Sequence, residues 1–202
     1  MTEELLIIFV KNPELGRVKT RLAATVGDEV ALDIYKRLLD RTKQMTSALP
    51  FDKTVFYDRI LAEEDLWNAK GFTKDIQPEG DLGERMSTAF QRSFKKGYKR
   101  ICIIGSDCYE LTTEILSDAF SALKSKNTVI GGAKDGGYYL VGMNQWLPEI
   151  FENKAWSTAE VYPSTIKDFK ELGMTFTELP KLNDIDREED LGSWADDLLT
   201  KK

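Results

Sequence analysis

The stretch LLIIFVKNPELGRVKTRL, from Leu5 to Leu22, decides the fold. Its first six residues, Leu5 to Val10, are apolar and β-prone with no polar alternation, which predicts a central strand buried on both faces. The chain changes character at Lys11, and Pro13 and Gly16 then interrupt regular structure. In α/β proteins, a buried strand that leads into a basic, glycine-containing loop presents backbone N–H groups and cations to phosphate. The first hypothesis is therefore a phosphate-handling loop.

The charge of this loop runs against that of the chain. Four cations fall within eleven positions, namely Lys11, Arg17, Lys19 and Arg21, and with Glu14 they leave a local charge of +3, whereas the whole chain carries -6. A solvated surface turn is the ordinary interpretation of a basic loop. Against an acidic background, the local excess favours an anion site. The loop matches neither the Walker pattern nor GxGxxG, so a nucleotide would bind by another geometry.

Length and composition predict one α/β domain over residues 1–202. The longest apolar runs are far too short for a membrane span, and the acidic start Met1-Thr2-Glu3-Glu4 differs from a signal peptide, so we expect a cytoplasmic protein with no membrane partner. Cys102 and Cys108 lack CxxC spacing, which favours free thiols.

The chain contains no histidine. This excludes Ser-His-Asp and Cys-His catalysis and any histidine-ligated metal, so proton transfer falls to Asp, Glu, Lys or Tyr. A metal would need oxygen ligands, which favours magnesium or manganese. The acidic balance argues against a nucleic-acid partner.

Strands and helices alternate along the predicted pattern. Strands are expected at 5–10, 53–57, 73–77, 100–105, 128–133, after the 135–137 turn, and at 174–179. Helices are expected after Asp28, at about 62–69, after the turn 77–86, after Thr112, at Pro148, after a Ser157–Glu160 capping box with Pro163 kinking or delaying it, and around 191–198. This alternation predicts a three-layer α/β/α sandwich with a mainly parallel mixed sheet.

Three segments place polar residues where a ligand could bind. Asp107 follows a buried strand, at the end where open α/β sheets bind ligands, although a cap for the next turn is an equal interpretation. Asp135-Gly136-Gly137 is a hairpin signal, and its second glycine permits close approach of a ligand. Asp186 with Glu189 has the pattern of a helix start.

Six ordered motifs carry a family resemblance: FVKNPELGRVKTRL, GDLGERM, GSDC, DGGYYLVG, WST and DIDREEDL. Together they span nearly the whole chain and resemble the glycosyltransferase-A-like family of small bacterial nucleotide-sugar transferases, the arsenosugar-biosynthesis-type glycosyltransferase group. The sequence is also similar to the phospholactate guanylyltransferase and molybdenum-cofactor nucleotidyltransferase families. The resemblance implies a nucleotide-diphospho-sugar transferase (GT-A, Rossmann-like) fold, with the nucleotide over the carboxyl ends of the first and fourth strands.

The same resemblance implies roles for individual residues. The expected nucleotide-binding residues are Lys11, Pro13, Gly16, Lys19, Thr20 and Arg21 in the first loop and Gly80, Asp81, Gly83 and Arg85 in the second turn, where Leu82 and Met86 also match. Asp107 is the expected metal ligand, with Asp186 or Asp184 as the second. The expected acceptor or sugar contacts are Asp135, Gly136, Gly137, Tyr138 and Trp156.

Two positions depart from the pattern of the related families. Tyr109 stands where they usually have proline after Asp107-Cys108, and Arg187-Glu188 replaces a common Thr-Pro. The second change leaves the choice between Asp184 and Asp186 open.

The function expected from these residues is metal-dependent glycosyl transfer from a nucleotide-diphospho-sugar donor to a small-molecule acceptor. Lys19, Asp107 and Asp135 are the expected catalytic residues, with Asp135 as general base or acceptor contact. Nucleotidyl transfer, which releases pyrophosphate from a nucleoside triphosphate, is the alternative on the same fold. A catalytically silent nucleotide-binding module is a third hypothesis. The sequence leaves donor, acceptor and oligomeric state open.

Overall fold

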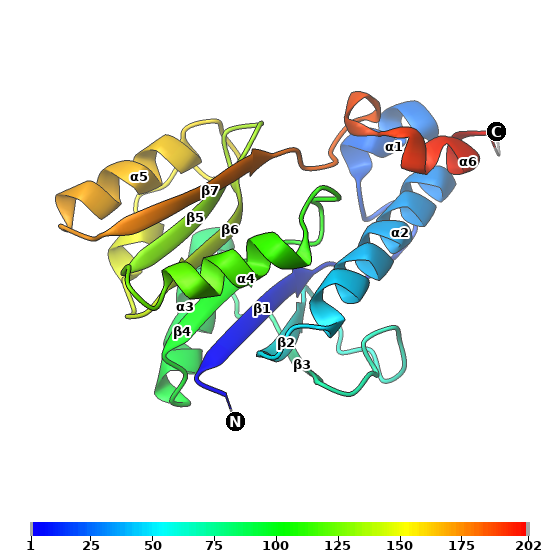
Figure 1. Cartoon of the computed structure of the whole chain (residues 1–202). Helices are drawn as coiled ribbons and strands as arrows, with labels where there is room; N and C mark the ends of the chain where they lie inside the picture. The colour runs from blue at the N-terminus through cyan, green and yellow to red at the C-terminus, as the bar shows by residue number, and fades with distance from the viewer. Residues whose placement is uncertain (1, 201–202) are drawn as a thin grey trace.

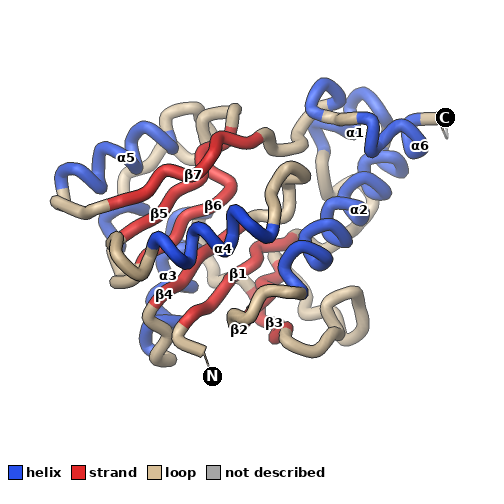
Figure 2. The backbone as a smooth tube through the Cα atoms, viewed as in Figure 1, coloured by secondary structure: helices blue, strands red, loops and turns tan. Residues whose placement is uncertain are grey.

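The computed structural model describes residues 2–200 as one seven-stranded sheet with helices on both faces (Figures 1 and 2). The strands are β1 (Glu4–Val10), β2 (Asp52–Tyr57), β3 (Phe72–Ile76), β4 (Arg100–Ile104), β5 (Thr128–Ala133), β6 (Tyr138–Met143) and β7 (Phe176–Leu182). The α-helices are α1 (Thr20–Val26), α2 (Asp28–Ser47), α3 (Leu82–Lys95), α4 (Thr113–Ala122), α5 (Val161–Glu171) and α6 (Asp196–Leu199). Three short 3-10 helices are η1 (Pro148–Phe151), η2 (Glu188–Asp190) and η3 (Ser193–Ala195).

The sheet has the order β3-β2-β1-β4-β6-β5-β7. All neighbouring strands pair in parallel except at β6, which is antiparallel to both β4 and β5. The carboxyl ends of the other six strands therefore share one edge of the sheet, where β6 begins. This mixed, mainly parallel sheet confirms the predicted fold class.

The central strand β1 is buried on both faces, as its unbroken apolar run predicts. Leu6, Ile8 and Val10 pack with α2 and α4, whereas Leu5, Ile7 and Phe9 pack with α3 and α5. In Figure 1, α4 lies in front of the sheet and α3 behind it. A third apolar cluster joins α1, the outer side of α2 and α6, and it includes Ile185.

Two local predictions are wrong. Residues 62–69 form turns and bends in place of a helix, because the Asp65 carboxylate binds the Trp67 backbone N–H, the Tyr57 hydroxyl and Lys74. The Ser157–Glu160 capping box is also absent: Ser157 has a φ of 65°, and α5 begins at Val161 with no side-chain cap. Pro163 then lies in the first turn of α5, where its missing N–H costs no helical hydrogen bond.

The remaining elements follow the predictions to within a few residues, and both cysteines are free and buried. The 135–137 turn joins β5 and β6 in the expected hairpin. The short helix α1 was not predicted. Within residues 2–200, no helix combines the length and the apolar character needed to cross a membrane.

Candidate functional site

The basic loop after β1 is held by side chains from neighbouring elements. The Tyr35 hydroxyl, on α2, accepts a hydrogen bond from Lys11 N at 2.7 Å and donates one to Lys11 O at 3.1 Å. Asn12 N donates to Asp58 Oδ1 at 2.7 Å, and the Asn12 amide bonds the backbone of Ile60 in both directions. These contacts fix the loop at the carboxyl ends of β1 and β2. Gly16, with a φ of 71°, supplies the left-handed turn within it.

Lys19 ends the loop and points inward. Its backbone adopts the left-handed conformation, with a φ of 48°, and precedes α1. The ammonium Nζ lies 2.8 Å from Asp107 Oδ1 and donates to Ile185 O at 2.5 Å. The Lys19 side chain is 6% exposed and that of Asp107 is 47% exposed. The buried cation therefore joins the loop after β4 to the C-terminal segment.

The C-terminal segment is docked on the loop after β4 by backbone hydrogen bonds. Ile185 N donates to Asp107 O at 2.9 Å, and Asn183 N donates to Glu110 Oε2 at 2.8 Å. Ile185 itself is buried in the cluster between α1, α2 and α6. Asp186 pairs with Arg21 at 2.6 Å. Residues 73 to 165 positions apart in the sequence thus form one side of the site.

The carboxylate of Asp190 folds this segment locally. It accepts hydrogen bonds from Asn183 Nδ2 at 3.0 Å, from Asp186 N at 3.0 Å and from Arg187 N at 2.7 Å. Although partial burial works in the opposite direction, these hydrogen bonds lower the pKa of Asp190. The turn that presents Asp184 and Asp186 is therefore closed by a charged acceptor.

Asp184 and Asp186 have different surroundings. Burial, and then the negative charges of Asp107 and Asp135, raise the pKa of Asp184 to about 7. The thiol of Cys108 donates a hydrogen bond to the same carboxyl. Asp186, in contrast, is held by an arginine. Asp184 therefore belongs to a group of carboxyls that includes Asp107, while Asp186 lies beside Arg21 on the more exposed rim.

These acids supply the oxygen donors that Mg²⁺ and Mn²⁺ prefer. Within residues 2–200, no group of three or more His, Cys, Asp or Glu side chains is arranged to hold a metal ion. Nucleotide sites bind Mg²⁺ through one or two carboxylates together with the phosphates of the substrate. Burial contributes most to the raised pKa of Asp184, and the negative charges of Asp107 and Asp135, which a cation would offset, contribute next. The donor set fits a divalent cation that arrives with its nucleotide.

A cavity of about 250 Å³ brings six predicted residues together at the carboxyl ends of β1 and β4. Its lining comprises Lys11, Lys19, Thr20, Arg21, Asp107 and Asp186, together with Val18 and Tyr35. Sequence reasoning missed Tyr35, because its helical spacing placed it among the apolar core residues. It also missed the Ile185 carbonyl, for which no sequence signal exists. Pro13 and Gly16 are not among the lining residues.

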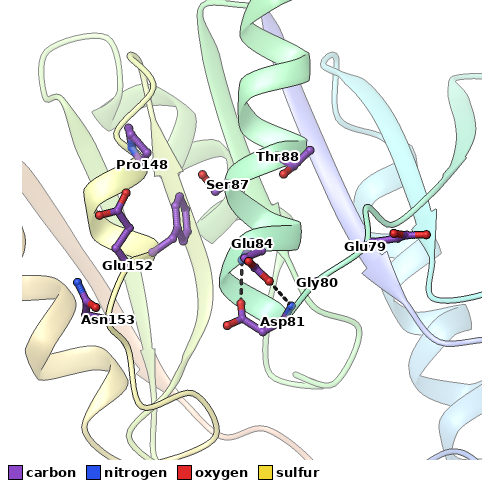
Figure 3. Close-up of a pocket in the computed structure, with 10 residues that line it drawn as sticks. Glu79, Gly80, Asp81, Glu84, Ser87, Thr88, Pro148, Glu152 and Asn153 are labelled. Atoms are coloured by element: carbon purple, nitrogen blue, oxygen red, sulfur yellow. Dashed lines mark hydrogen bonds between the residues drawn. The ribbon is translucent and has the colours of Figure 1, made fainter.

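A second, larger cavity of about 810 Å³ lies between the first half of α3 and η1, and Figure 3 shows its lining. It contains the predicted residues Gly80 and Asp81. Asp81 caps α3 in a capping box with Glu84, which the dashed lines of Figure 3 mark. Acidic side chains dominate this cavity: Glu79, Asp81, Glu84 and Glu152 all line it. Such a surface repels a diphosphate, whereas Lys11, Lys19 and Arg21 bring three cations to the smaller cavity.

The second predicted turn lies at the same sheet edge as the first loop. Gln77 Nε2 donates to Val10 O at 3.1 Å and to Phe56 O at 3.2 Å, where β1 and β2 end. Arg85 Nε donates to Gly80 O at 2.7 Å, which closes the turn. A Cβ added at Gly83 would lie 2.4 Å from the Trp156 ring, so the indole packs directly on this helix. The structure thus brings Trp156 to the second turn.

The predicted acceptor segment is divided between two environments. Asp135 does not line the basic cavity, but its charge acts on both Arg21 and Asp184, and its Oδ1 accepts a hydrogen bond from Gly137 N at 2.9 Å. Gly136, with a φ of 92°, packs against the backbone of Ala159. Tyr138 points the other way, into the α3 layer, where its hydroxyl lies 3.8 Å from Met86 Sδ.

The chain is similar to known proteins in sequence and in structure. A family model described as "Uncharacterized protein conserved in bacteria (DUF2064)" matches residues 40–158. The chain is a member of this family. No curated protein resembles this DUF2064 protein closely enough to match.

Solved structures share the fold of this DUF2064 protein over its whole length. A Desulfovibrio desulfuricans G20 protein, described as a candidate nucleotide-diphospho-sugar transferase, is 30% identical, with a TM-score of 0.87 over 100% of this chain and 98% of that one. An inositol-1-phosphate CTP transferase from T. maritima is 14% identical, with a TM-score of 0.56 over 98% and 95% of the two chains. Rv0371C from Mycobacterium tuberculosis H37Rv, in complex with manganese, is 12% identical, with a TM-score of 0.50 over 100% of both chains. The first of these confirms the resemblance to nucleotide-diphospho-sugar transferases, and the other two share the fold.

Proposed function

We propose that this DUF2064 protein is a transferase that moves a sugar from a nucleotide-diphospho-sugar to a small-molecule acceptor, with a divalent cation as cofactor. The observation that carries the proposal is the basic cavity at the carboxyl ends of β1 and β4, where Lys11, Lys19 and Arg21 face Asp107. Ligands of open α/β sheets bind at such a crevice. The 30% identical relative described as a candidate nucleotide-diphospho-sugar transferase supports the same assignment.

In the proposed reaction an acceptor hydroxyl attacks the anomeric carbon of the donor sugar. The bond between that carbon and the β-phosphate oxygen breaks, and the nucleoside diphosphate leaves with the electron pair. Asp135, whose charge acts on Arg21 of the cavity lining, accepts the proton of the hydroxyl. Lys11 and Arg21 stabilise the negative charge that grows on the leaving diphosphate.

Asp107 and Asp184 are the residues that would hold the cation, and Asp186 on the rim would remain paired with Arg21. When bound, a Mg²⁺ or Mn²⁺ ion supplies positive charge to the diphosphate oxygens. Lys19 has to release Asp107 or share it, since its ammonium lies on that carboxylate in the ligand-free protein. The manganese complex of Rv0371C, which shares the fold, makes Mn²⁺ the first cation to test.

Nucleotidyl transfer is the second candidate, in which an acceptor phosphate attacks the α-phosphorus of a nucleoside triphosphate and pyrophosphate leaves. The inositol-1-phosphate CTP transferase with the same fold favours it. Both reactions need cations around the phosphates of a nucleotide, a nucleoside diphosphate leaving in the first and pyrophosphate in the second, so the cavity suits either. A silent nucleotide-binding module is the third candidate.

A thermal-shift panel with nucleoside mono-, di- and triphosphates and nucleotide sugars, each with and without Mn²⁺, tests these candidates. A ligand at about one hundred times its Kd stabilises a fold by roughly 2.7 kcal/mol. Stabilisation by one nucleotide sugar with Mn²⁺ supports glycosyl transfer. A response confined to triphosphates, followed by pyrophosphate release, supports nucleotidyl transfer. Binding without turnover, unchanged in Asp107→Ala, would leave the silent module.

A further inference from the structure

The C-terminal strap, which we define as residues 183–199, brings Asp184 and Asp186 to the site from the far end of the chain. Figure 1 shows it leaving β7 and crossing to α1 and α2, where α6 ends the described chain. Its contacts beside Asp107 include the hydrogen bond from Ile185 N to Asp107 O, the hydrogen bond from Asn183 N to the Glu110 carboxylate, the Lys19 bond to Ile185 O and the Arg21–Asp186 ion pair. Of these contacts, the exposed Arg21–Asp186 pair stabilises the strap only slightly, whereas the Lys19 bond to Ile185 O is buried.

A stacked aromatic pair joins the strap to the Asp107 loop. The rings of Tyr109 and Trp194 lie with centroids 4.1 Å apart and planes 7° from parallel. Tyr109 is two residues from Asp107, and Trp194 is in η3, eight residues beyond Asp186. A stack of this geometry adds stabilisation beyond the area that it buries. The stack therefore adds a further contact between the strap, which carries Asp184 and Asp186, and the Asp107 loop.

Two arginines of α2 support the same pair. The Arg41 guanidinium lies 5.6 Å from the centroid of the Tyr109 ring and bonds the carbonyls of Tyr109 and Leu111 at 3.4 Å. Arg37 donates to Trp194 O at 2.5 Å and to both carboxylate oxygens of Asp197. Helix α2 thus contacts Tyr109 through Arg41 and Trp194 through Arg37, and these two arginines are one helical turn apart.

We infer that Tyr109 and Trp194 are positioning residues, a clasp that holds the C-terminal strap so that Asp184 and Asp186 face Asp107, Lys19 and Arg21. This inference rests on the proposed function for its consequence in catalysis. The clasp itself is a property of the fold. Neither ring lines the basic cavity, so both act through the carboxyls that they place.

Hydrogen exchange of the full chain tests the clasp without any ligand. Tyr109→Ala and the bulkier Tyr109→Leu both remove the stack. If Tyr109→Ala fails to fold, exchange can still be measured in Tyr109→Leu. We expect the amides of 183–190 to exchange about tenfold faster in both variants, while β1 and β4 stay unchanged. Tyr109→Phe, which keeps the ring, should match the wild type. Unchanged exchange in the strap, or an equal rise throughout the chain, would overturn the inference.

Binding of manganese with inorganic pyrophosphate, the smallest diphosphate probe, tests the consequence. We expect an apparent Kd about tenfold higher in Tyr109→Leu and restored in Tyr109→Phe. Phe94→Ala, which removes a partly buried ring from the opposite face of the sheet, is the control for general destabilisation and should keep the wild-type Kd. A loosened strap with unchanged affinity would refute the positioning role. If the wild type binds neither this probe nor any nucleotide, the proposed function fails, while the exchange data still decide the clasp.

Discussion

The ammonium of Lys19 lies 2.8 Å from Asp107 Oδ1, and this pair joins the loop after β1 to the loop after β4. The lysine is almost fully buried, whereas the aspartate is about half exposed. The same ammonium also bonds Ile185 O, so three segments of chain meet at one nitrogen. The contacts between these three segments therefore depend on the same side chain.

Lys19→Met should lower the free energy of unfolding by about 1–3 kcal/mol at pH 7.5, because it leaves Ile185 O without its donor and the neighbouring carboxylates without their cation. Urea unfolding measures the loss. Lys36→Met, which removes an exposed lysine 3.9 Å from Asp33, should change little. Equal effects of the two substitutions would show that the buried pair has no special importance.

Asp184→Asn should stabilise the protein in a pH-dependent way. The pKa of Asp184 is about 7 in the fold against an ordinary 3.8, so the folded state binds this proton more tightly than the unfolded chain. The protonated Asp184 carboxyl therefore contributes its full share to the stability of the wild type below pH 3.8. This contribution is lost as the pH rises through 7. The variant should gain about 2–4 kcal/mol over the wild type at pH 8 and nothing near pH 4.

Denaturant unfolding of Asp184→Asn across pH 4 to 8 measures this gain. Asp118→Asn, on the exposed side of α4, is the control for the loss of one negative charge. A gain of the same size at both ends of the pH range would contradict the assigned cause. If Asp184 also holds the cation, the more stable variant should respond less to Mn²⁺ with a nucleotide.

Arg21→Ala should weaken the binding of a nucleoside diphosphate at least tenfold, since it removes a cation that lines the basic cavity. The melting temperature of the ligand-free protein should stay nearly constant, because the Arg21–Asp186 pair is exposed. Arg17→Ala is a matched control from the same loop: Arg17 is 61% exposed in its side chain and does not line the cavity. A similar loss of affinity in both variants would indicate that the positive charge of the loop attracts the nucleotide without a defined binding site.

Tyr35→Phe should destabilise the protein by about 1–3 kcal/mol, because the backbone N–H and carbonyl of Lys11 both lose their partner. Exchange of the Lys11 amide should rise with it. Tyr98→Phe removes a part-buried hydroxyl bound to Asp52 at 3.0 Å, and its effect should be smaller. A loop that exchanges as in the wild type would mean that Asn12 and Asp58 hold it alone.

Local sequence patterns predicted much of this fold. The unbroken apolar run of β1, the amphipathic spacing of α3 and the Asp-Gly-Gly turn each describe neighbours along the chain, and such neighbours decide strands, helices and hairpins. Where a tertiary contact competes with the pattern, the prediction fails. Asp65 illustrates this, since its carboxylate binds Tyr57 and Lys74 from two strands and residues 62–69 remain a loop.

The kinds of residue at the site could also be predicted from the sequence. Which acid pairs with which cation could not. The basic loop and the acid after β4 stand out as residue types, so Lys19, Arg21 and Asp107 could be named from the residues, whereas Asp186 was named through the family resemblance. Which acid lies by which cation depends on the path of the strap. Asp184 lies under the influence of the Asp107 and Asp135 carboxylates, and Asp186 pairs with Arg21, a choice that the motif leaves open.

Local sequence patterns therefore set the strands, most helices and the kinds of side chain at the carboxyl edge of the sheet. Tertiary structure alone decided the Lys19 bond to Ile185 O, across 166 positions, and the stack of Tyr109 on Trp194. The two kinds of interaction differ in how far apart in the sequence their partners lie. Periodicity and capping act within a few residues, whereas hydrogen bonds and stacking between distant segments exist only after the sheet and its helices have set those segments side by side.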